Sequence, residues 1–302
     1  IVPSVRGAEI SRPVDDIVEE ARRLADDGVT EITLLGQNVN SYGRDLALAA
    51  RRNGADVRVR PQFAHLLRQV GGIDGIERVR FTSPHPKDLR DDTIAAMADT
   101  SAVCNHLHLP LQSGSDRILA AMHRGYTAER YLDRLRAAQA GIDDLAVTTD
   151  IIVGFPGETE ADFEATLELT ATAGYDSAYT FVFSPREGTE AADMTDDFVD
   201  PDAIKERMER LRHVVERSAL ARNQLRVGRR EEVVVEGPSK RNPDVLSGRT
   251  RQNKLVHFAG ALRVGTLAEV EITHAATHYL RGEIREVLRG PRTRTRIPVV
   301  AG

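Results

Sequence analysis

The chain has 302 residues, of which 41% are hydrophobic, and its 41 Lys or Arg and 46 Asp or Glu give a net charge of −5. This apolar content suffices for one large core and one small core. No apolar run approaches the ~18 residues of a membrane-spanning helix, and one cysteine cannot build a disulfide framework or an all-cysteine metal site, so we exclude a membrane protein and a disulfide-stabilised fold.

The first two thirds of the chain repeat a helix followed by a short apolar strand. Helical periodicity covers residues 13–28, 61–70, 88–98, 127–140 and 159–173, and the strands that follow are predicted at 32–35, 79–81, 107–109, 147–153 and 178–183. Five such units predict a parallel sheet, and the lack of a Gly-rich dinucleotide turn favours a barrel or partial barrel.

The last third has a different pattern. An acidic stretch at 193–201 precedes a predicted helix at 201–225, and residues 231–287 then alternate apolar and polar side chains between glycines. This alternation predicts a small antiparallel β-barrel, and we expect the tail from Gly290 to be disordered. From Arg226 to Gly302 the net charge is +7, against −12 for the rest, so the C-terminal part is the candidate polyanion binder.

Polar or glycine-rich segments follow every predicted strand of the larger part. They are Gly36-Gln37-Asn38, Ser83-Pro84-His85, Gln112-Ser113-Gly114-Ser115, Gly154-Phe155-Pro156-Gly157-Glu158 and Ser184-Pro185-Arg186. Because the chemistry of α/β barrels lies at the carboxyl ends of the strands, these segments predict a functional site there.

Three features of the sequence also have ordinary explanations. His106 and His108 lie on one face of a strand, but a metal site needs a third ligand, so packing or a polar network is the favoured role. Cys104 is expected to be a buried apolar residue, because an iron–sulfur cluster takes three or four thiolates. Similarly, 36–43 could be a plain polar turn.

Several motifs, in the same order and spacing, resemble the methylthiotransferases of the radical S-adenosylmethionine family. They are Leu34-Leu35-Gly36-Gln37-Asn38-Val39-Asn40, His108-Leu109-Pro110-Leu111-Gln112-Ser113-Gly114-Ser115, Asp150-Ile151-Ile152-Val153-Gly154-Phe155-Pro156-Gly157-Glu158-Thr159 and Phe183-Ser184-Pro185-Arg186. The first of them favours the tRNA-specific branch, often called MiaB. The start, Ile1-Val2-Pro3, is similar to the segment that follows the cluster motif Cys-x3-Cys-x2-Cys in that family.

The resemblance implies a partial (β/α)6 radical-SAM barrel over 1–200, a connecting helix over 201–226, an RNA-binding TRAM domain over 227–289 and a disordered tail over 290–302. It also implies S-adenosylmethionine as cofactor. The implied cofactor-binding residues are Gly36, Gln37, Asn38, Ser83, Gln112, Ser113, Asp150, Gly154 and Arg186. Within this set, Gln112 and Ser113 would meet sugar hydroxyls, and Gly154 would let adenine approach the backbone.

Cations are assigned by the same resemblance. Arg186 could meet the carboxylate of the cofactor or a tRNA phosphate, and Arg6 is a further cation beside the cluster loop. Ser247-Gly248-Arg249-Thr250-Arg251-Gln252-Asn253-Lys254 matches a TRAM hairpin. The expected phosphate-binding surface consists of Lys240, Arg241, Arg249, Arg251 and Lys254.

The implied activity is transfer of a methylthio group to C2 of N6-(dimethylallyl)adenosine at position 37 of tRNA, in a cytoplasmic monomer without membrane contact. The parent protein would carry two [4Fe-4S] clusters and receive electrons from a donor such as flavodoxin or ferredoxin. The cluster cysteines are expected just before Ile1, so we expect this chain alone to be inactive. The alternatives are a substrate such as a ribosomal protein aspartate or threonylcarbamoyl adenosine, and a cysteine-less tRNA-binding homologue without catalysis.

Overall fold

The computed structural model describes residues 10–240 and 242–291. Five strands of the larger part run parallel: β1 (Glu31–Leu34), β2 (Arg78–Phe81), β3 (His106–His108), β4 (Ala146–Val153) and β5 (Ser177–Val182). β1 pairs with β2, and β3, β4 and β5 form a second sheet in that order. A bridge between Val79 and Val103 links the two sheets. The predicted fold class, a partial α/β barrel, is confirmed.

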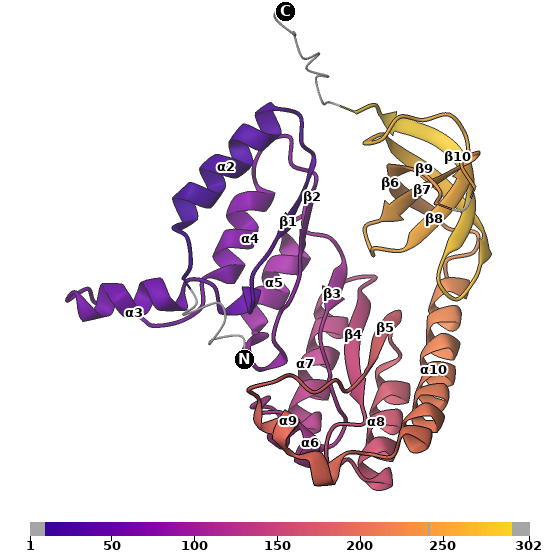
Figure 1. The fold of residues 1–302 in the computed structure, drawn as a ribbon. Coiled ribbons are helices and arrows are strands. Elements are labelled where there is room, and N and C mark those ends of the chain that lie inside the picture. Colours follow the sequence, from indigo (N-terminus) through magenta and orange to yellow (C-terminus); the bar gives the residue numbers. More distant parts are fainter. Residues whose placement is uncertain (1–9, 241, 292–302) are drawn as a thin grey trace, which may run out of the picture.

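Helices cover the outer side of these strands (Figure 1). They are α2 (Val14–Asp26), α4 (Phe63–Gly71), α5 (Asp91–Asp99), α7 (Ala128–Gly141) and α8 (Glu160–Ala173). Along β4, Val147 and Ile151 are buried under the helices, whereas the alternate residues Thr148 and Asp150 remain partly exposed. Because side chains alternate across a strand, the outer face forms the core and the inner face is left polar.

Three helices were not predicted. α3 (Arg44–Arg52) projects from the body (Figure 1), and α6 (Asp116–Ala121) and α9 (Glu190–Asp193) are short. Short 3-10 turns also form after β1 (η1, Val39–Ser41), after β2 (η2, Pro86–Asp88) and in the predicted acidic break (η3, Thr195–Asp197). The sequence pattern did not predict α3, in which only Ala47 is buried.

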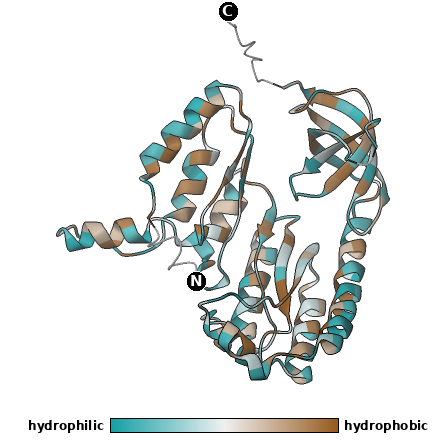
Figure 2. Ribbon diagram, in the orientation of Figure 1, coloured by the Kyte–Doolittle hydropathy of each residue, from teal (hydrophilic) through white to brown (hydrophobic). Residues whose placement is uncertain are grey.

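A long helix, α10 (Pro201–Gln224), leads into the small barrel. Its strands are β6 (Arg230–Pro238), β7 (Val245–Thr250), β8 (Leu255–Ala259), β9 (Leu267–Ala275) and β10 (Leu280–Arg289). Apolar and polar residues alternate along them (Figure 2), and Val233, Val256 and Val270 are fully buried inside. The barrel is closed, and the prediction of antiparallel pairing is wrong at one seam, where β10 pairs with β8 in parallel.

The small barrel packs on the amino ends of the parallel strands. Its β7–β8 turn places Arg251 within 2.8 Å of the Val103 carbonyl and Gln252 within 2.7 Å of Asp144, just before β3 and β4 respectively. Lys254 forms an ion pair of 2.7 Å with Asp176, just before β5. The carboxyl ends of the strands, at the other end of the sheet, are therefore left free of the small barrel. Among the described residues no helix is both long and apolar enough to cross a membrane.

Candidate functional site

Two asparagines of the first motif, Asn38 and Asn40, join the loops that follow β1 and β2. Asn38 donates from Nδ2 to Asp88 Oδ2 at 2.7 Å, and the fully buried Asn40 exchanges two hydrogen bonds with the backbone of His85, at 2.8 and 3.0 Å. The Val39 amide donates to the Ser83 carbonyl. The two loops therefore form one unit.

The loops after β3 and β4 form a second unit. The Gln112 amide donates to the Asp150 carbonyl at 2.8 Å, and the Gln112 carbonyl accepts from the Ile152 amide at 2.9 Å. Both Ser83 and Gln112 have left-handed backbone, with φ of 58° and 67°. Non-glycine residues rarely adopt this conformation, and it concentrates at functional sites.

Tyr126 connects the two units. Its hydroxyl donates to the Leu111 carbonyl at 3.0 Å, and its ring stands edge-on to His85 with centroids 5.5 Å apart. Burial raises the pKa of Tyr126 to about 12, so the phenol stays protonated and can serve as this donor. Tyr126 therefore has a packing and hydrogen-bonding role between the two units.

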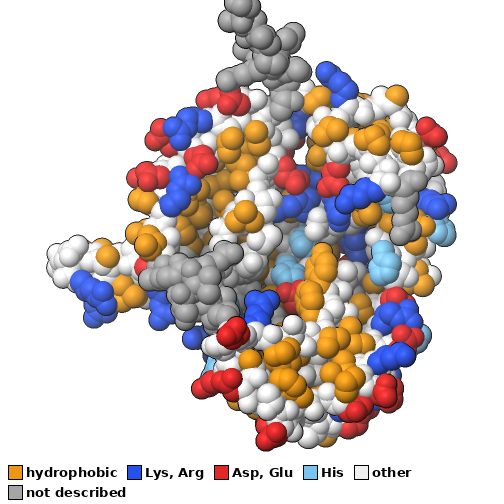
Figure 3. Space-filling model, viewed as in Figure 1, with side chains coloured by type: hydrophobic (Ala, Val, Ile, Leu, Met, Phe, Trp, Pro, Cys, Tyr) orange, Lys and Arg blue, Asp and Glu red, His pale blue; other side chains and the backbone are white. Residues whose placement is uncertain are grey.

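A polar network lines the inner face of β3 and β4. Thr148 Oγ1 lies 3.0 Å from both His106 Nε2 and His108 Nδ1, and His108 Nε2 lies 3.3 Å from Asp150 Oδ2. Burial, and then the nearby charge of Arg80, lower the pKa of His106 to about 3, so this imidazole is neutral at neutral pH. Figure 3 shows histidine, acidic and basic side chains gathered at the centre of the molecule. The sequence favoured packing or a polar network for the two histidines, and the structure has a polar network that includes Thr148, which the sequence did not indicate.

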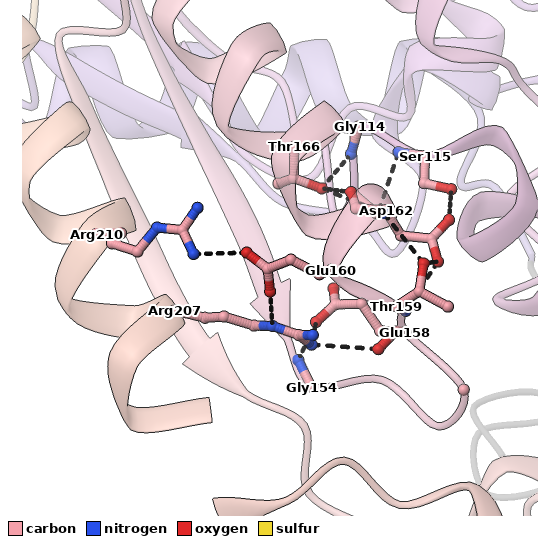
Figure 4. Close-up of polar contacts among 12 residues, drawn as sticks. Gly114, Ser115, Gly154, Glu158, Thr159, Glu160, Asp162, Thr166, Arg207 and Arg210 are labelled. Carbon is pink, nitrogen blue, oxygen red and sulfur yellow. Dashed lines mark hydrogen bonds and ion pairs between the residues drawn. The ribbon is translucent and has the colours of Figure 1, made fainter. Parts of the chain in front are cut away.

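Behind the loops, charged residues fix the segments that follow β3 and β4 (Figure 4). Asp162, in the first turn of α8, accepts hydrogen bonds from Ser115 at 2.6 Å, from Thr159 and from Arg117. Burial raises the pKa of Asp162, but these hydrogen bonds outweigh burial and hold the pKa well below its usual value. Asp162 therefore ties the Gln112–Ser115 loop to the start of α8 as a carboxylate.

We expect Asp162→Asn to lower the free energy of unfolding by about 2 kcal/mol at neutral pH, because a charged acceptor of several hydrogen bonds is lost. Since the folded pKa of Asp162 is depressed, its contribution is present above the ordinary value of 3.8 and disappears as the pH falls through the folded pKa. Urea unfolding of both proteins across this range measures it. Asp133→Asn, whose exposed side chain lies 3.9 Å from Arg136, is the control; an equal and pH-independent loss in both variants contradicts the prediction.

The structure gives several predicted cofactor residues a structural role. Ser113 is fully buried, and its hydroxyl lies 3.3 Å from Thr166, so it does not reach the site. A side chain at Gly154 would stand 2.7 Å from Ile204, so the glycine allows the close approach of α10 and does not open space for adenine on that side. Glu158 lies in the loop before α8, because that helix begins at Glu160.

The other predicted residues keep groups available for a ligand. Gln37 is exposed, and Gly36 lies beside it at the end of β1. Asn38 Oδ1 is buried and has no partner among the described residues. Asp150 is partly exposed beside His108. Arg186 is exposed, and its guanidinium forms no ion pair with a described residue.

The predicted phosphate-binding surface of the small barrel differs from the prediction. Arg251 and Lys254 point into the interface with the larger part, where Lys254 is only 8% exposed, so neither belongs to an open basic surface. Arg249 lies 3.5 Å from Glu236. Lys240 is exposed, and Arg241 lies outside the described residues, as do Arg6 and Ile1.

The described residues do not form a metal centre. No group of three or more His, Cys, Asp or Glu in this part of the chain could hold a metal ion. Cys104 is 2% exposed, and burial raises the pKa of its thiol. This agrees with the expected packing role of Cys104.

A partial α/β barrel with a polar site at the carboxyl ends of its strands, followed by a small closed β-barrel, defines a two-part protein of the α/β barrel class. A family model of the radical SAM superfamily matches residues 1–170, and a TRAM domain model matches residues 224–284. The chain belongs to the radical SAM superfamily, whose members use S-adenosylmethionine and an iron–sulfur cluster.

The chain is also similar to curated proteins named tRNA-2-methylthio-N(6)-dimethylallyladenosine synthase. That of Moorella thermoacetica is 49% identical over 286 residues, which cover 94% of this chain and 62% of the relative. For synthase 1 of Mycobacterium marinum the identity is 51%, with 93% and 55% covered, and for the Salinispora arenicola protein it is 50%, with 94% and 56% covered. The chain thus spans little more than half the length of these relatives.

Proposed function

We propose that this chain is the barrel and RNA-binding part of a tRNA methylthiotransferase, which converts N6-(dimethylallyl)adenosine at position 37 of tRNA to its 2-methylthio derivative. The observation that carries the proposal is the identity of about one half over more than nine tenths of the chain to relatives of that name. Under this proposal the partner is tRNA, the electron donor is a flavodoxin or ferredoxin, and the protein acts in the cytoplasm.

The residues at the strand ends suit S-adenosylmethionine. The buried acceptor Asn38 Oδ1 has no hydrogen-bond partner in the described part of the chain, the carboxylate of Asp150 is partly exposed, and Gln112 has left-handed backbone. Amide and carboxylate groups match the hydroxyl and amino groups of a nucleoside ligand. The bound cofactor supplies radical and methyl-transfer chemistry, while the protein supplies binding and orientation.

The described residues do not suit an iron–sulfur cluster, because the sequence has one cysteine and Cys104 is buried on the inside of the fold. We assign both clusters of the proposed enzyme to cysteines outside this sequence, and we derive no step at them.

Asp150 has the central role in this proposal. His108 stands 3.3 Å from its Oδ2 and is itself held by Thr148, so the carboxylate has a fixed orientation on the inner face. We infer that Asp150 accepts a hydrogen bond from a hydroxyl or amino group of the bound nucleoside. The neutral His106, which contacts Thr148, adds no positive charge to this face.

The test uses a bacterial strain whose tRNA carries dimethylallyl adenosine without the methylthio group. The full-length gene that encodes this chain is expressed in that strain. Mass spectrometry of tRNA digests is expected to detect the 2-methylthio nucleoside. A methylthio group on threonylcarbamoyl adenosine, or none on tRNA at all, contradicts the proposal.

In the same assay we expect Asp150→Asn to lower the initial rate of methylthio nucleoside formation by about 10- to 100-fold, as the loss of a hydrogen bond to a charged group does. Asp133→Asn on the outer helix α7 is the matched control and should keep the wild-type rate. Equal rates for Asp150→Asn and Asp133→Asn would show that Asp150 has no part in the reaction.

A further inference from the structure

The segment between the first site loop and α4 forms a projecting arm. This arm, residues 43–61, leaves the body just after η1 and contains α3 (Figure 1). The residues that flank its two ends are joined, because the Gln62 amide donates to the Tyr42 carbonyl at 2.7 Å. The Gly43 amide also donates to Ser11 Oγ at 2.9 Å, which ties the start of the arm to the segment before α2. The base of the arm therefore adjoins the loop that holds Asn38 and Asn40.

The arm is strongly basic in an acidic protein. It carries five arginines against two aspartates, whereas the whole chain has a net charge of −5. All five arginines are exposed, and none forms an ion pair with a described residue; they are Arg44, Arg51, Arg52, Arg58 and Arg60. Basic side chains are visible on the arm in Figure 3.

The arginines are arranged as a surface. Arg44 and Arg51 are seven residues apart in α3, so they lie on nearly the same side of the helix, about 10 Å apart along its axis. Where the arm returns, Arg58 and Arg60 border a hollow of about 800 Å³ between α3 and α4, which Arg68, Asp56 and Asp92 also line. Arg68 is paired with Asp99 at 2.8 Å, so Arg58 and Arg60, which form no ion pair with a described residue, are the cations that can bind an anion there.

The cations of the small barrel are used differently. Arg251 and Lys254 are bound to carbonyl and carboxylate groups at the amino ends of the strands, at the opposite end from the site. The arm, in contrast, has free cations at the site's own end. A nucleic acid whose target base lies in the site would extend past the arm. Its phosphates are the groups that exposed arginines bind.

We propose that the arm binds the phosphate backbone of tRNA beside the target nucleotide. This inference rests on the proposed function, since it takes the substrate to be tRNA. The arm then adds sequence-independent affinity and holds the anticodon stem-loop against the mouth of the barrel, whereas the small barrel contacts the RNA elsewhere.

The test compares two double variants that remove the same charge. Arg51→Ala/Arg52→Ala removes two cations from the arm. Arg22→Ala/Arg217→Ala removes two exposed arginines from α2 and α10 that form no ion pair with any residue the structure describes. Binding of dye-labelled tRNA to the 302-residue chain is measured by fluorescence anisotropy between about 50 and 200 mM salt. Thermal unfolding of each variant checks that the fold is intact.

We expect the arm variant to bind tRNA roughly tenfold more weakly and to lower the slope of log affinity against log salt by about 1.5. The control variant should match the wild type. Equal losses of tRNA affinity in both variants overturn the proposal. No loss of affinity in the arm variant overturns it as well, and this is the result expected if the arm binds an acidic protein instead. If the wild-type chain binds no tRNA, the proposed function fails together with the arm.

Discussion

Arg78→Ala is expected to lower the free energy of unfolding by about 3–5 kcal/mol, because it breaks a buried charge network between the two parts of the chain. The Arg78 side chain is 1% exposed. Its guanidinium donates to the Glu232 side chain and main chain, both at 2.8 Å, and to the Arg249 carbonyl at 2.8 Å. Alanine leaves a carboxylate and two carbonyl groups without their donors, at the point where β2 meets the small barrel.

Urea unfolding at neutral pH measures the loss. Arg230→Ala provides the control, because Arg230 is 62% exposed and pairs with Glu269 at 3.0 Å on the surface of the same barrel, where an ion pair contributes less than about 1 kcal/mol. If Arg78→Ala is no more destabilising than Arg230→Ala, the interface does not depend on Arg78.

This interface explains how the two parts divide the molecule. Arg78 and Arg80 of β2 reach into the small barrel, and Arg251 reaches back to the carbonyl groups before β3. Each guanidinium binds backbone carbonyl groups, which gives a fixed orientation to both partners. Within the described residues, the small barrel therefore closes the amino ends of the strands and leaves the carboxyl ends uncovered.

Much of the fold could be predicted because it depends on local pattern. The five strands follow from short apolar runs, and the site loops follow from the polar segments after them. The relative placement of the two barrels could not be predicted, because it depends on pairs such as Lys254 with Asp176 and Arg78 with Glu232, far apart in the chain. Composition shows that Lys254 is charged but not which surface it faces.

The positions of some candidate site residues also follow from the local sequence pattern. Asn38 lies in the loop after β1, whereas Asp150 lies within β4, where alternation along the strand places its side chain on the inner face. Gly154 was assigned to a ligand, yet the space beside it is filled by Ile204, which follows it by fifty residues. A glycine in a sequence indicates a close approach but does not identify what approaches.

Arg207→Met is the second substitution with a large expected effect, because Arg207 supports the loop after β4 from α10 (Figure 4). Its guanidinium donates to Glu158 Oε2 at 3.0 Å, and the two side chains are 7% and 0% exposed. Glu158 in turn accepts from the Gly154 amide at 2.9 Å. Methionine keeps the volume but leaves a buried carboxylate without its cation, and the expected cost near neutral pH is about 3–5 kcal/mol.

The pH dependence separates this charge effect from lost packing. Burial raises the pKa of Glu158 above its ordinary value of 4.5 even with Arg207 present, so the folded protein holds this proton more tightly than the unfolded chain, and stability from this group falls as the pH rises through the folded pKa. Removing the cation raises that pKa further. The Arg207→Met variant should therefore lose less stability at about pH 5 than at about pH 7 in urea unfolding.

A second change tests the cause directly. Glu158→Gln keeps an oxygen for the Gly154 amide and removes the charge, so in the Arg207→Met background it should restore more than half of the lost stability near neutral pH. Arg212→Met, on the exposed side of the same helix, should leave stability unchanged. If the double variant is no more stable than Arg207→Met alone, the loop is held by packing of α10 against Gly154 and not by the buried ion pair.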